Sequence, residues 1–478
     1  MKNEQGIIGL FIDGNYFFTE QTVEHRNVYH QTLLGHLSQA DATHLNLAVE
    51  AASNAQKQWA MLPAYRRSEL LFALAEELQR NTEEAAMLIV AETAKPITLA
   101  RAEIMRAVTT YRLSAEEATR LQGETLVMDA VRGGEGKSAF TVLEPVGVIA
   151  AITPFNFPFN LVAHKIGPAL AAGNAVIIKP SSQTPCCALW IAEAAKRVGI
   201  QDGVINVIIG SGGIIGDALV THKGIQMISF TGSFDVGLHI RSIAGLRKTL
   251  LELGSNSAVI LDQSTDINLI APKLASGACA FSGQVCISIQ RIAVHESQHD
   301  QLCSLLKTIF SGWIVGTDPA ESNTSMSKMI NSSALIKAKN AVQQAKNAGA
   351  TVICGDDYHE MSMWPTVLTD CPSHLDIVQQ EMFAPIVVIQ KYRDIQEAID
   401  WVNDSRYGLN TGFYSNNLKH VWHAIRTIKS GALLINEIPT YRADHMPYGG
   451  VKDSGTGKEG VAYAVREMCH EKLIVIQP

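Results

Sequence analysis

The stretch VGVIAAITPFNFPFNLVAHKIGPALAAGNAVIIKP (146–180) places a segment of helix length between two short apolar runs. The runs are VGVIAAI (146–152) and AVIIK (175–179), and HKIGPALAAG lies between them. Strands that are apolar throughout and alternate with helices are typical of βαβ units in a parallel sheet covered on both faces. The stretch therefore predicts the beginning of a doubly wound α/β domain.

The same alternation continues along the chain and then begins again. VINVII (204–209) and MISF (227–230) extend the first sheet, and TPCCALWIAEAAKRVG has the length of a helix. After Gly254 the pattern restarts with IAVHES, ALIKAKNAVQQAKNAG, IVVIQKY and GALLIN, which indicates a second α/β unit. Two outlying segments, LVMDAVRGGEGKSAFTVLE (126–144) and EKLIVIQP (471–478), look like strands suited to edge pairing.

The segment before this sheet is helical in pattern. Leucines at helical spacing predict one helix, and Asn81 with Glu84 resembles a capping box that opens the next, which Pro96 ends. The leucines are Leu70, Leu71, Leu74 and Leu78.

The composition of the 478 residues excludes several classes of function. A net charge of −7 without a basic run argues against nucleic acid, because phosphate binding needs clustered Lys and Arg. No signal peptide or apolar run of membrane length is present, so we expect a cytoplasmic protein without membrane contact. The eight cysteines show no metal-ligand spacing, so we expect free thiols, no metal, and a small molecule as partner.

Turn-forming residues follow the predicted strands at their carboxyl ends, where ligands bind in open α/β sheets. GSGGIIG (210–216) has the glycine content of a dinucleotide turn, although a plain tight turn into a helix has the same composition. Lys179 is placed either to bind a ribose hydroxyl or to be solvated. Four such loops could line one crevice: TPFNFP, KPSSQTP, GSGGIIG and TGS.

Three residues have the chemistry of acyl transfer. GACAFSGQVCISIQR predicts a helical segment that breaks at Gly283 and re-enters structure at Cys286, where a helix start would favour the thiolate. Burial of Glu252 at the end of an apolar strand would raise its pKa into the range of a general base. The Asn156 amide can stabilise an oxyanion. The alternatives are an inert packed thiol, an ion-paired or capping glutamate, and a turn-forming asparagine.

Taken together, these features resemble the aldehyde dehydrogenase superfamily over nearly the whole chain. Nine motifs carry the resemblance, in the order ETAKP (92–96), TPFNFPFN (153–160), KPSSQTP (179–185), FTGS (230–233), LELGSN (251–256), GQVC (283–286), EMFAPIV (381–387), YGLNTGFYS (407–415) and MPYGGVKDSGTGKEG (446–460).

The resemblance implies the aldehyde dehydrogenase fold, which combines a Rossmann-like doubly wound cofactor domain, an α/β catalytic domain and a small β arm that builds homodimers or homotetramers. The corresponding ranges are 1–125 with 145–253 for NAD(P) binding, 254–445 for catalysis, and 126–144 with 446–478 for the bridging arm.

The resemblance also implies the reaction. Cys286 attacks the aldehyde, the Asn156 side chain and the Cys286 N–H hold the oxyanion, and hydride passes to the nicotinamide. Glu252 then activates the water that hydrolyses the thioester to a carboxylic acid.

By resemblance, Lys179 binds the adenine ribose, Gly232 and Ser233 the pyrophosphate, and Glu381 with Phe383 the nicotinamide ribose. Ser182 stands where many NAD-preferring relatives carry a glutamate, so both NAD and NADP are expected cofactors. Ala94 replaces the usual glycine of the ETGKP pattern. The remaining cofactor candidates are Thr153, Pro154, Phe155, Gly212, Gly216, Phe230 and Leu253.

The stretches AVTTYRLSAEEATRLQGE (107–124) and NEIPTYRADHMPYGGVKDSG (436–455) resemble the branch that includes lactaldehyde and glycolaldehyde dehydrogenases. A short hydroxyaldehyde is therefore the expected substrate; alternatives are a semialdehyde, a phosphate- or phosphonate-bearing aldehyde, a CoA-acylating reaction, or a non-catalytic relative. Arg442 could instead tie its loop to a subunit interface. By resemblance, His470 lies near the substrate entrance. The substrate candidates are Arg106, Phe157, Val285, Arg442 and His445.

Overall fold

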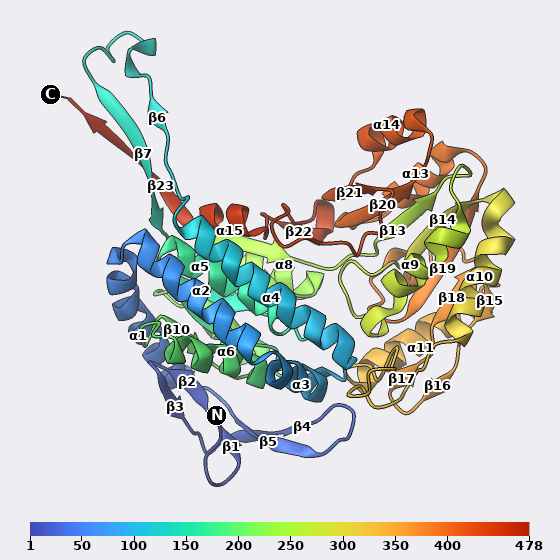
Figure 1. Cartoon of the computed structure of the whole chain (residues 1–478), viewed down its shortest axis with the longest axis horizontal. Coiled ribbons are helices and arrows are strands. Elements are labelled where there is room, and N and C mark those ends of the chain that lie inside the picture. The colour runs from blue at the N-terminus through green and yellow to red at the C-terminus, as the bar shows by residue number, and fades with distance from the viewer. Residues whose placement is uncertain (478) are drawn as a thin grey trace.

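The computed structural model describes residues 1–477, which form two lobes and a β arm that projects from the first lobe (Figure 1). The first lobe contains an eight-stranded sheet in the order β22-β12-β11-β8-β9-β10-β2-β3. Its central five strands are parallel. The strands are β8 (Val148–Ile152), β9 (Ala175–Lys179), β10 (Ile205–Val207), β11 (Met227–Thr231), β12 (Lys248–Glu252), β2 (Leu10–Ile12), β3 (Asn15–Phe17) and β22 (Gly455–Thr456).

The strand order reverses between β8 and β11. The chain runs from β8 through β9 to β10 and then returns to place β11 on the other side of β8. At such a switch point the connections leave in opposite directions, which opens a crevice at the carboxyl ends of the two strands. The loops that begin at Thr153 and Gly232 therefore meet there. The sheet confirms the predicted doubly wound α/β domain.

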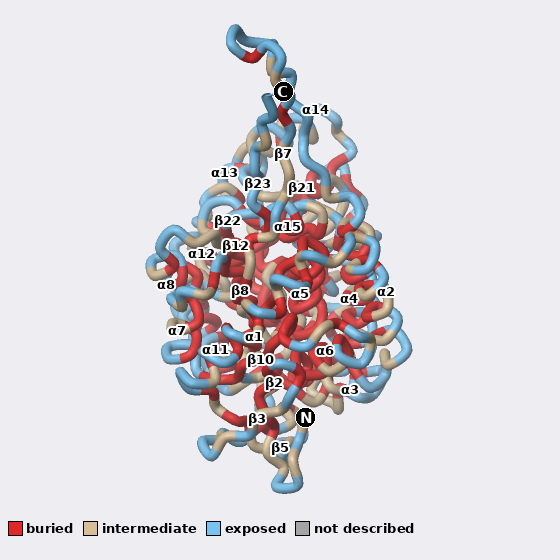
Figure 2. Tube along the Cα trace, turned by 90° about the vertical axis from the view of Figure 1, so that its left-hand side faces the viewer, coloured by how far each residue is buried: buried red, intermediate tan, exposed pale blue. Residues whose placement is uncertain are grey.

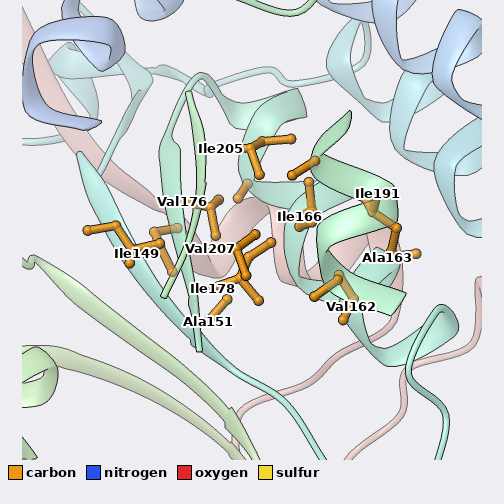
Figure 3. Close-up of a cluster of buried hydrophobic side chains, with 14 of the residues drawn as sticks. Ile149, Ala151, Val162, Ala163, Ile166, Val176, Ile178, Ile191, Ile205 and Val207 are labelled. Atoms are coloured by element: carbon orange, nitrogen blue, oxygen red, sulfur yellow. The ribbon is translucent and has the colours of Figure 1, made fainter. Parts of the chain in front are cut away.

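Helices cover this sheet on both faces because its strands are buried on both sides. Figure 3 shows Ile149, Val176 and Ile178 of the strands packed against Ile166 and Ile191 of the neighbouring helices. The covering helices are α1 (Ala42–Met61), α2 (Ala64–Arg80), α3 (Thr82–Thr93), α4 (Ile97–Ala118), α5 (Asn160–Ala172), α6 (Pro185–Arg197), α7 (Asp217–Thr221) and α8 (Phe234–Ile243).

The helix break predicted at Asn81 occurs, but the capping box does not form. The Asn81 side chain donates to the Glu77 carbonyl, and Glu84 accepts a hydrogen bond from the Trp190 indole on α6. The buried Trp190 indole thus takes the carboxylate that would otherwise have capped α3.

The second lobe contains a seven-stranded sheet in the order β15-β18-β19-β14-β13-β20-β21, parallel except for β15. The strands are β13 (Ala258–Leu261), β14 (Arg291–His295), β15 (Thr351–Cys354), β18 (Thr366–Thr369), β19 (Ile386–Tyr392), β20 (Asn410–Tyr414) and β21 (Ala432–Ile435). The helices are α9 (Ile267–Cys279), α10 (His299–Ser311), α11 (Ser332–Asn347), α12 (Asp376–Gln379), α13 (Ile395–Asn403) and α14 (Leu418–Thr427).

The arm consists of β6 (Thr125–Leu126), β7 (Ser138–Pro145) and β23 (Cys469–Ile476), and Figure 2 shows most of it exposed. The assignment of 446–478 to the arm was too broad. Gly455–Thr456 pairs with β12, and helix α15 (Val461–Glu467) packs its apolar side against α5 in the first lobe.

Short strands complete the chain. β1 (Ile7–Ile8), β4 (Thr22–Arg26) and β5 (Leu33–Ser38) form a separate sheet at the base of the first lobe, and β16 (Tyr358–His359) pairs with β17 (Ser362–Met363). Within residues 1–477, no helix combines the length and the apolar character needed to cross a membrane.

Candidate active site

Cys286 follows a tightly wound loop between the two lobes. After α9, Phe281, Ser282 and Gly283 all have positive φ, at 51°, 55° and 68°. A Cβ at position 283 would lie 2.2 Å from the Ala384 carbonyl oxygen, so only glycine fits. Such a left-handed run is costly and marks a segment held by its surroundings.

The predicted helix start at Cys286 is absent. The residue lies in a turn closed by the Ser288 N–H, which donates to the Val285 carbonyl, so the thiol does not stand at the start of a helix. Burial raises the Cys286 pKa to about 11, although Tyr448 and Arg442 act in the opposite direction. The thiol is partly exposed toward a cavity.

Asn156 is held directly beside this turn. Its buried side-chain Nδ2 donates to the Gln284 carbonyl at 3.0 Å, two residues before the cysteine. Its own carbonyl accepts from Lys95 Nζ at 2.6 Å. Within residues 1–477 the Cys286 N–H makes no hydrogen bond, and the second amide hydrogen of Asn156 has no partner either, so both donors are free to bind an oxygen of a ligand.

Glu252 is the last residue of β12, and the surroundings of its carboxyl group are unusual. Its carboxyl group is buried and neither oxygen has a hydrogen-bond partner within residues 1–477. Burial, together with the nearby Glu459 carboxylate, raises the Glu252 pKa well above its ordinary value. A Cβ at Gly449 would come within 2.9 Å of Glu252 Oε1, so the carboxyl group lies against the residue that follows Tyr448.

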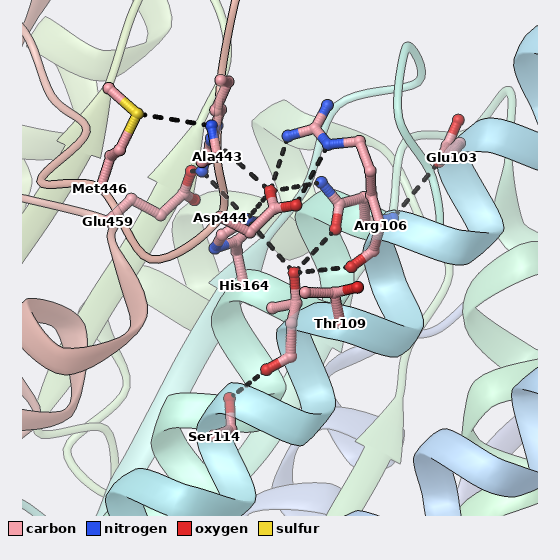
Figure 4. A network of polar contacts seen from close by, with 12 residues as sticks. Glu103, Arg106, Thr109, Ser114, His164, Ala443, Asp444, Met446 and Glu459 are labelled. Atoms are coloured by element: carbon pink, nitrogen blue, oxygen red, sulfur yellow. Dashed lines mark hydrogen bonds and ion pairs between the residues drawn. The ribbon is translucent and has the colours of Figure 1, made fainter.

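A buried polar network adjoins these residues (Figure 4). Asp444 accepts from Arg106 and lies 2.9 Å from His164 Nε2. Arg442 pairs with Glu459 at 3.1 Å, and Glu459 pairs with Lys165 at 3.2 Å. Although burial acts against ionisation, Lys165 and Arg442 hold the Glu459 pKa at about 2. The network thus keeps a full negative charge near the partnerless Glu252.

Two cavities lie at the carboxyl ends of the first sheet. One, of about 310 Å³, contains Cys286 and Asn156 and is also lined by Pro154, Phe155, Leu161, Thr231, Gly232, Ser233, Leu253, Gly254, Glu381 and Phe383. The other, of about 420 Å³, is lined by Lys179, Gly212, Gly213, Gly216 and residues of α8. The two cavities adjoin at the end of β8, where Pro154 lines the first and Ile152 lines the second. They adjoin again at the start of α8. The α8 N-terminus, where the two cavities adjoin, would hold the pyrophosphate of an extended dinucleotide.

Most cofactor candidates therefore line one cavity or the other. Thr153 and Phe230 are buried beside the cavities, and Ser182 is exposed and lines a third cavity with Gly210 and Ser211. Burial raises the pKa of Glu381 to about 7, although the hydrogen bond that its carboxylate accepts from the Ser255 N–H acts in the opposite direction.

Some of the candidate substrate residues lie at the site, and others lie away from it. Phe157 lies under the guanidinium of Arg106, and Val285 packs beside Cys286 with Tyr448. The Arg442 side chain is only 6% exposed and stacks on Tyr448. His445, by contrast, is exposed and makes no hydrogen bond within residues 1–477, and His470 lies on the arm strand β23 opposite Glu144. These two histidines are not brought to the site.

Several residues of the site were missed by sequence reasoning. The signal for His164 and Lys165 was available, because both stand inside an otherwise apolar helix. Tyr448, Asp444 and Glu459 come from the C-terminal loop, whose return to the first lobe the sequence pattern did not indicate.

One cluster has the side chains of a metal site. His25, Glu92 and Cys186 lie together and are buried. The Glu92 carboxylate already accepts from the backbone N–H groups of Cys186 and Cys187 at 2.9 and 3.1 Å and contacts His25. Glu92 therefore caps α6.

A doubly wound sheet with two adjoining cavities at its switch point, one of them lined by a cysteine, is the arrangement expected of a nicotinamide-dependent oxidoreductase. The sequence profile described as "Aldehyde dehydrogenase family" matches residues 17–474. The chain belongs to the aldehyde dehydrogenase family, as the motifs predicted.

Individual relatives agree with this assignment. The chain is 42% identical to the 3-sulfolactaldehyde dehydrogenase of Priestia aryabhattai, over 98% of each chain. It is 34% identical to the lactaldehyde dehydrogenase of Methanococcus vannielii, over 98% of this chain and 99% of the relative. The NADP-dependent glyceraldehyde-3-phosphate dehydrogenase of Bacillus halodurans, solved with NADP, superposes with a TM-score of 0.95 at 33% identity, covering 98% and 99%.

The expected cofactor is confirmed as NAD or NADP, since solved structures with this fold hold one or the other. The protein is an NAD(P)-dependent aldehyde dehydrogenase, which oxidises an aldehyde.

Proposed function

We propose that the protein oxidises a short hydroxyaldehyde, such as lactaldehyde or glycolaldehyde, through a covalent Cys286 intermediate. The observation that carries this proposal is the shared cavity of Cys286 and Asn156, in which the thiol and the amide face the same space. Relatives at 42% and 34% identity are named for three-carbon hydroxyaldehydes. The proposal fits both observations.

The residues divide the reaction into two steps. The Cys286 thiolate bonds to the aldehyde carbon, and the resulting oxyanion is held by Asn156 Nδ2 and the Cys286 N–H. The nicotinamide, when bound, accepts the hydride that leaves this carbon. Glu252 takes a proton from water, whose oxygen bonds to the thioester carbon while the Cys286 sulfur leaves. The acid is released and the thiolate is restored.

The polar groups near Cys286 favour an uncharged hydroxyaldehyde. Arg106 is paired with Asp444, and Arg442 is paired with Glu459, so each guanidinium is already neutralised by a carboxylate. A carboxylate or sulfonate tail would have to displace one of these partners. A hydroxyl group needs only one donor or acceptor and displaces neither.

A second candidate is an anionic hydroxyaldehyde such as 3-sulfolactaldehyde. The specific observation in its favour is that two arginines belong to the polar network beside the site: Arg106, 31% exposed, pairs with Asp444, and Arg442 stacks on Tyr448, whose hydroxyl lies 3.0 Å from Cys286 Sγ. Arginine binds planar or tetrahedral oxyanions through paired N–H groups. The relative at 42% identity carries this substrate in its name.

The finer organisation is part of the proposal. We assign cofactor binding to 1–125 and 145–253, catalysis chiefly to 254–445, and subunit contact to the arm. The arm supports a homodimer or homotetramer, because β7 and β23 expose apolar side chains, namely Phe140, Leu473, Val475 and Ile476.

All eight cysteines are free, as expected for a protein of the reducing cytoplasm.

The test is a kinetic comparison of lactaldehyde, glycolaldehyde, 3-sulfolactaldehyde and succinate semialdehyde, each with NAD and NADP and with or without CoA, followed by absorbance of the reduced cofactor. Cys286→Ser should abolish turnover, whereas the matched variant Cys279→Ser, at a buried thiol of α9, should retain it. Full activity of Cys286→Ser, or an absolute need for CoA, would overturn the mechanism. A preference for 3-sulfolactaldehyde would select the second candidate.

A further inference from the structure

The Tyr448 hydroxyl lies 3.0 Å from Cys286 Sγ. Within residues 1–477 it is the only side chain that hydrogen-bonds this sulfur. The Tyr448 ring is 6% exposed and packs with Ile287 and Leu409, so the hydroxyl is held in one position. This contact therefore belongs to the built geometry of the site.

The hydroxyl is a hydrogen-bond donor and not a base. Burial raises the Tyr448 pKa well above its ordinary value, and the thiolate would raise it further, so the phenol keeps its proton. The Arg442 guanidinium carbon lies 3.7 Å from the centre of the Tyr448 ring. A cation on the ring face draws charge from the ring and makes the O–H a better donor. Glu459 fixes Arg442 in that place.

Other charged groups act against a thiolate at Cys286. Glu252 and Glu381 are the acidic groups that face it, and burial acts in the same direction. Reactive cysteines in proteins are usually activated by a helix N-terminus or a neighbouring cation. No helix begins at Cys286, and Arg442, a cation that lowers the Cys286 pKa, stacks on the Tyr448 ring.

We propose that Tyr448 is a further catalytic residue, whose hydroxyl donates a hydrogen bond to the Cys286 thiolate. This inference rests on the proposed role of Cys286 as nucleophile. The thiol proton leaves to solvent, and the Tyr448 O–H then bonds the negative sulfur. When the sulfur bonds to the aldehyde carbon, its charge passes to the carbonyl oxygen and the Tyr448 hydrogen bond weakens. Tyr448 keeps its own proton throughout.

The test is Tyr448→Phe, which removes only the hydroxyl and retains the ring beneath Arg442. The rate at which iodoacetamide alkylates Cys286 is measured against pH, without cofactor or aldehyde, on the peptide that contains Cys286, by mass spectrometry. Because a hydrogen bond to a charged group is worth about one pKa unit or more, the midpoint should rise by about one pH unit. The kcat/KM for the aldehyde near neutral pH should fall about tenfold.

The matched control is Tyr414→Phe, at a buried tyrosine of β20 whose hydroxyl has no partner within residues 1–477. It should leave the alkylation midpoint and kcat/KM unchanged. An unchanged midpoint in Tyr448→Phe would overturn the inference about Tyr448. Activity retained by Cys286→Ser would instead overturn the proposed mechanism, so the two failures are distinguishable.

Discussion

Asp444 receives two nitrogens of one guanidinium: Arg106 Nη2 lies 2.6 Å from Oδ1 and Nε lies 3.2 Å from Oδ2. The same Oδ1 lies 2.9 Å from His164 Nε2. Although burial acts against it, these partners hold the Asp444 pKa well below its ordinary range. The carboxylate therefore already occupies two of the N–H donors that Arg106 would offer to the tail of an anionic aldehyde.

Replacing this carboxylate should change the choice of substrate. Asp444→Asn keeps the shape of the side chain but leaves the Arg106 charge unpaired, so an anionic tail gains a partner. The ratio of kcat/KM for succinate semialdehyde to that for lactaldehyde should rise about tenfold, since one such pair is worth about 1.5 kcal/mol or more. Steady-state kinetics with both aldehydes checks this.

The control for this experiment is Arg106→Gln in the Asp444→Asn background. It should return the ratio toward its original value, because the cation that binds the tail is gone. A ratio that Asp444→Asn leaves unchanged would show that Arg106 does not face the substrate.

Glu252→Gln should separate the two halves of the reaction. Without a general base the thioester forms but is hydrolysed slowly, so kcat falls by about 10²–10⁴-fold. A first turnover should still produce a burst of reduced cofactor close to one per active site, seen by stopped flow. Loss of the burst together with kcat would place Glu252 in the acylation step instead.

The pH dependence follows from the same residue. A general base acts when deprotonated, and the raised pKa of Glu252 moves the rising limb of kcat to a pH well above the ordinary range of a glutamate. Glu252 also makes the free energy of unfolding depend on pH, because the folded protein favours its protonated form. This stabilising contribution is fully present below the pKa that Glu252 has in the unfolded chain, and it is lost as the pH rises through its pKa in the folded protein. Glu252→Gln should therefore melt higher than the parent at about pH 8 and by a smaller margin at about pH 5.

The sequence predicted the parts of this molecule that depend on local pattern. Apolar runs such as 146–152 identified the sheet because a strand buried on both faces must be apolar throughout. Motif chemistry led to Cys286, Asn156 and Glu252, each fixed near the end of an element, and the structure brings Asn156 and Cys286 to one cavity.

The parts that were not predicted depend on contacts between distant segments. The helix start expected at Cys286 is a turn, because Gly283 passes against the Ala384 carbonyl of another segment. Tyr448 and Asp444 reach the site only because the C-terminal loop returns to β12. His445 was expected at the substrate, but its side chain is exposed, whereas the neighbouring Asp444 is the residue of this turn that is buried in the polar network.

The cofactor choice should depend on Ser182. It lies three residues after Lys179, the last residue of β9, and lines a cavity with Gly210 and Ser211, and its neutral hydroxyl would not repel a 2′-phosphate. Ser182→Glu should lower kcat/KM for NADP about tenfold or more and leave that for NAD nearly unchanged, because the new charge repels only the phosphate. Ser182→Gln, which has the same length without the charge, is the control. Equal losses with both cofactors would show that position 182 does not face the ribose.

We expect the backbone of Ala94 to be strained. It ends α3 in the left-handed region, with φ 55° and ψ 24°, where an alanine costs about 1–2 kcal/mol. Ala94→Gly relieves this strain but loses a buried methyl group and adds freedom to the unfolded chain, so the net change should stay within about 1 kcal/mol. Ala86→Gly, equally buried inside α3 with right-handed backbone, has the same losses and no relief, and should cost about 2 kcal/mol. In thermal unfolding measured side by side, the melting temperature of Ala94→Gly should therefore be clearly higher than that of Ala86→Gly. Equal melting temperatures would show that the left-handed conformation of Ala94 carries no strain.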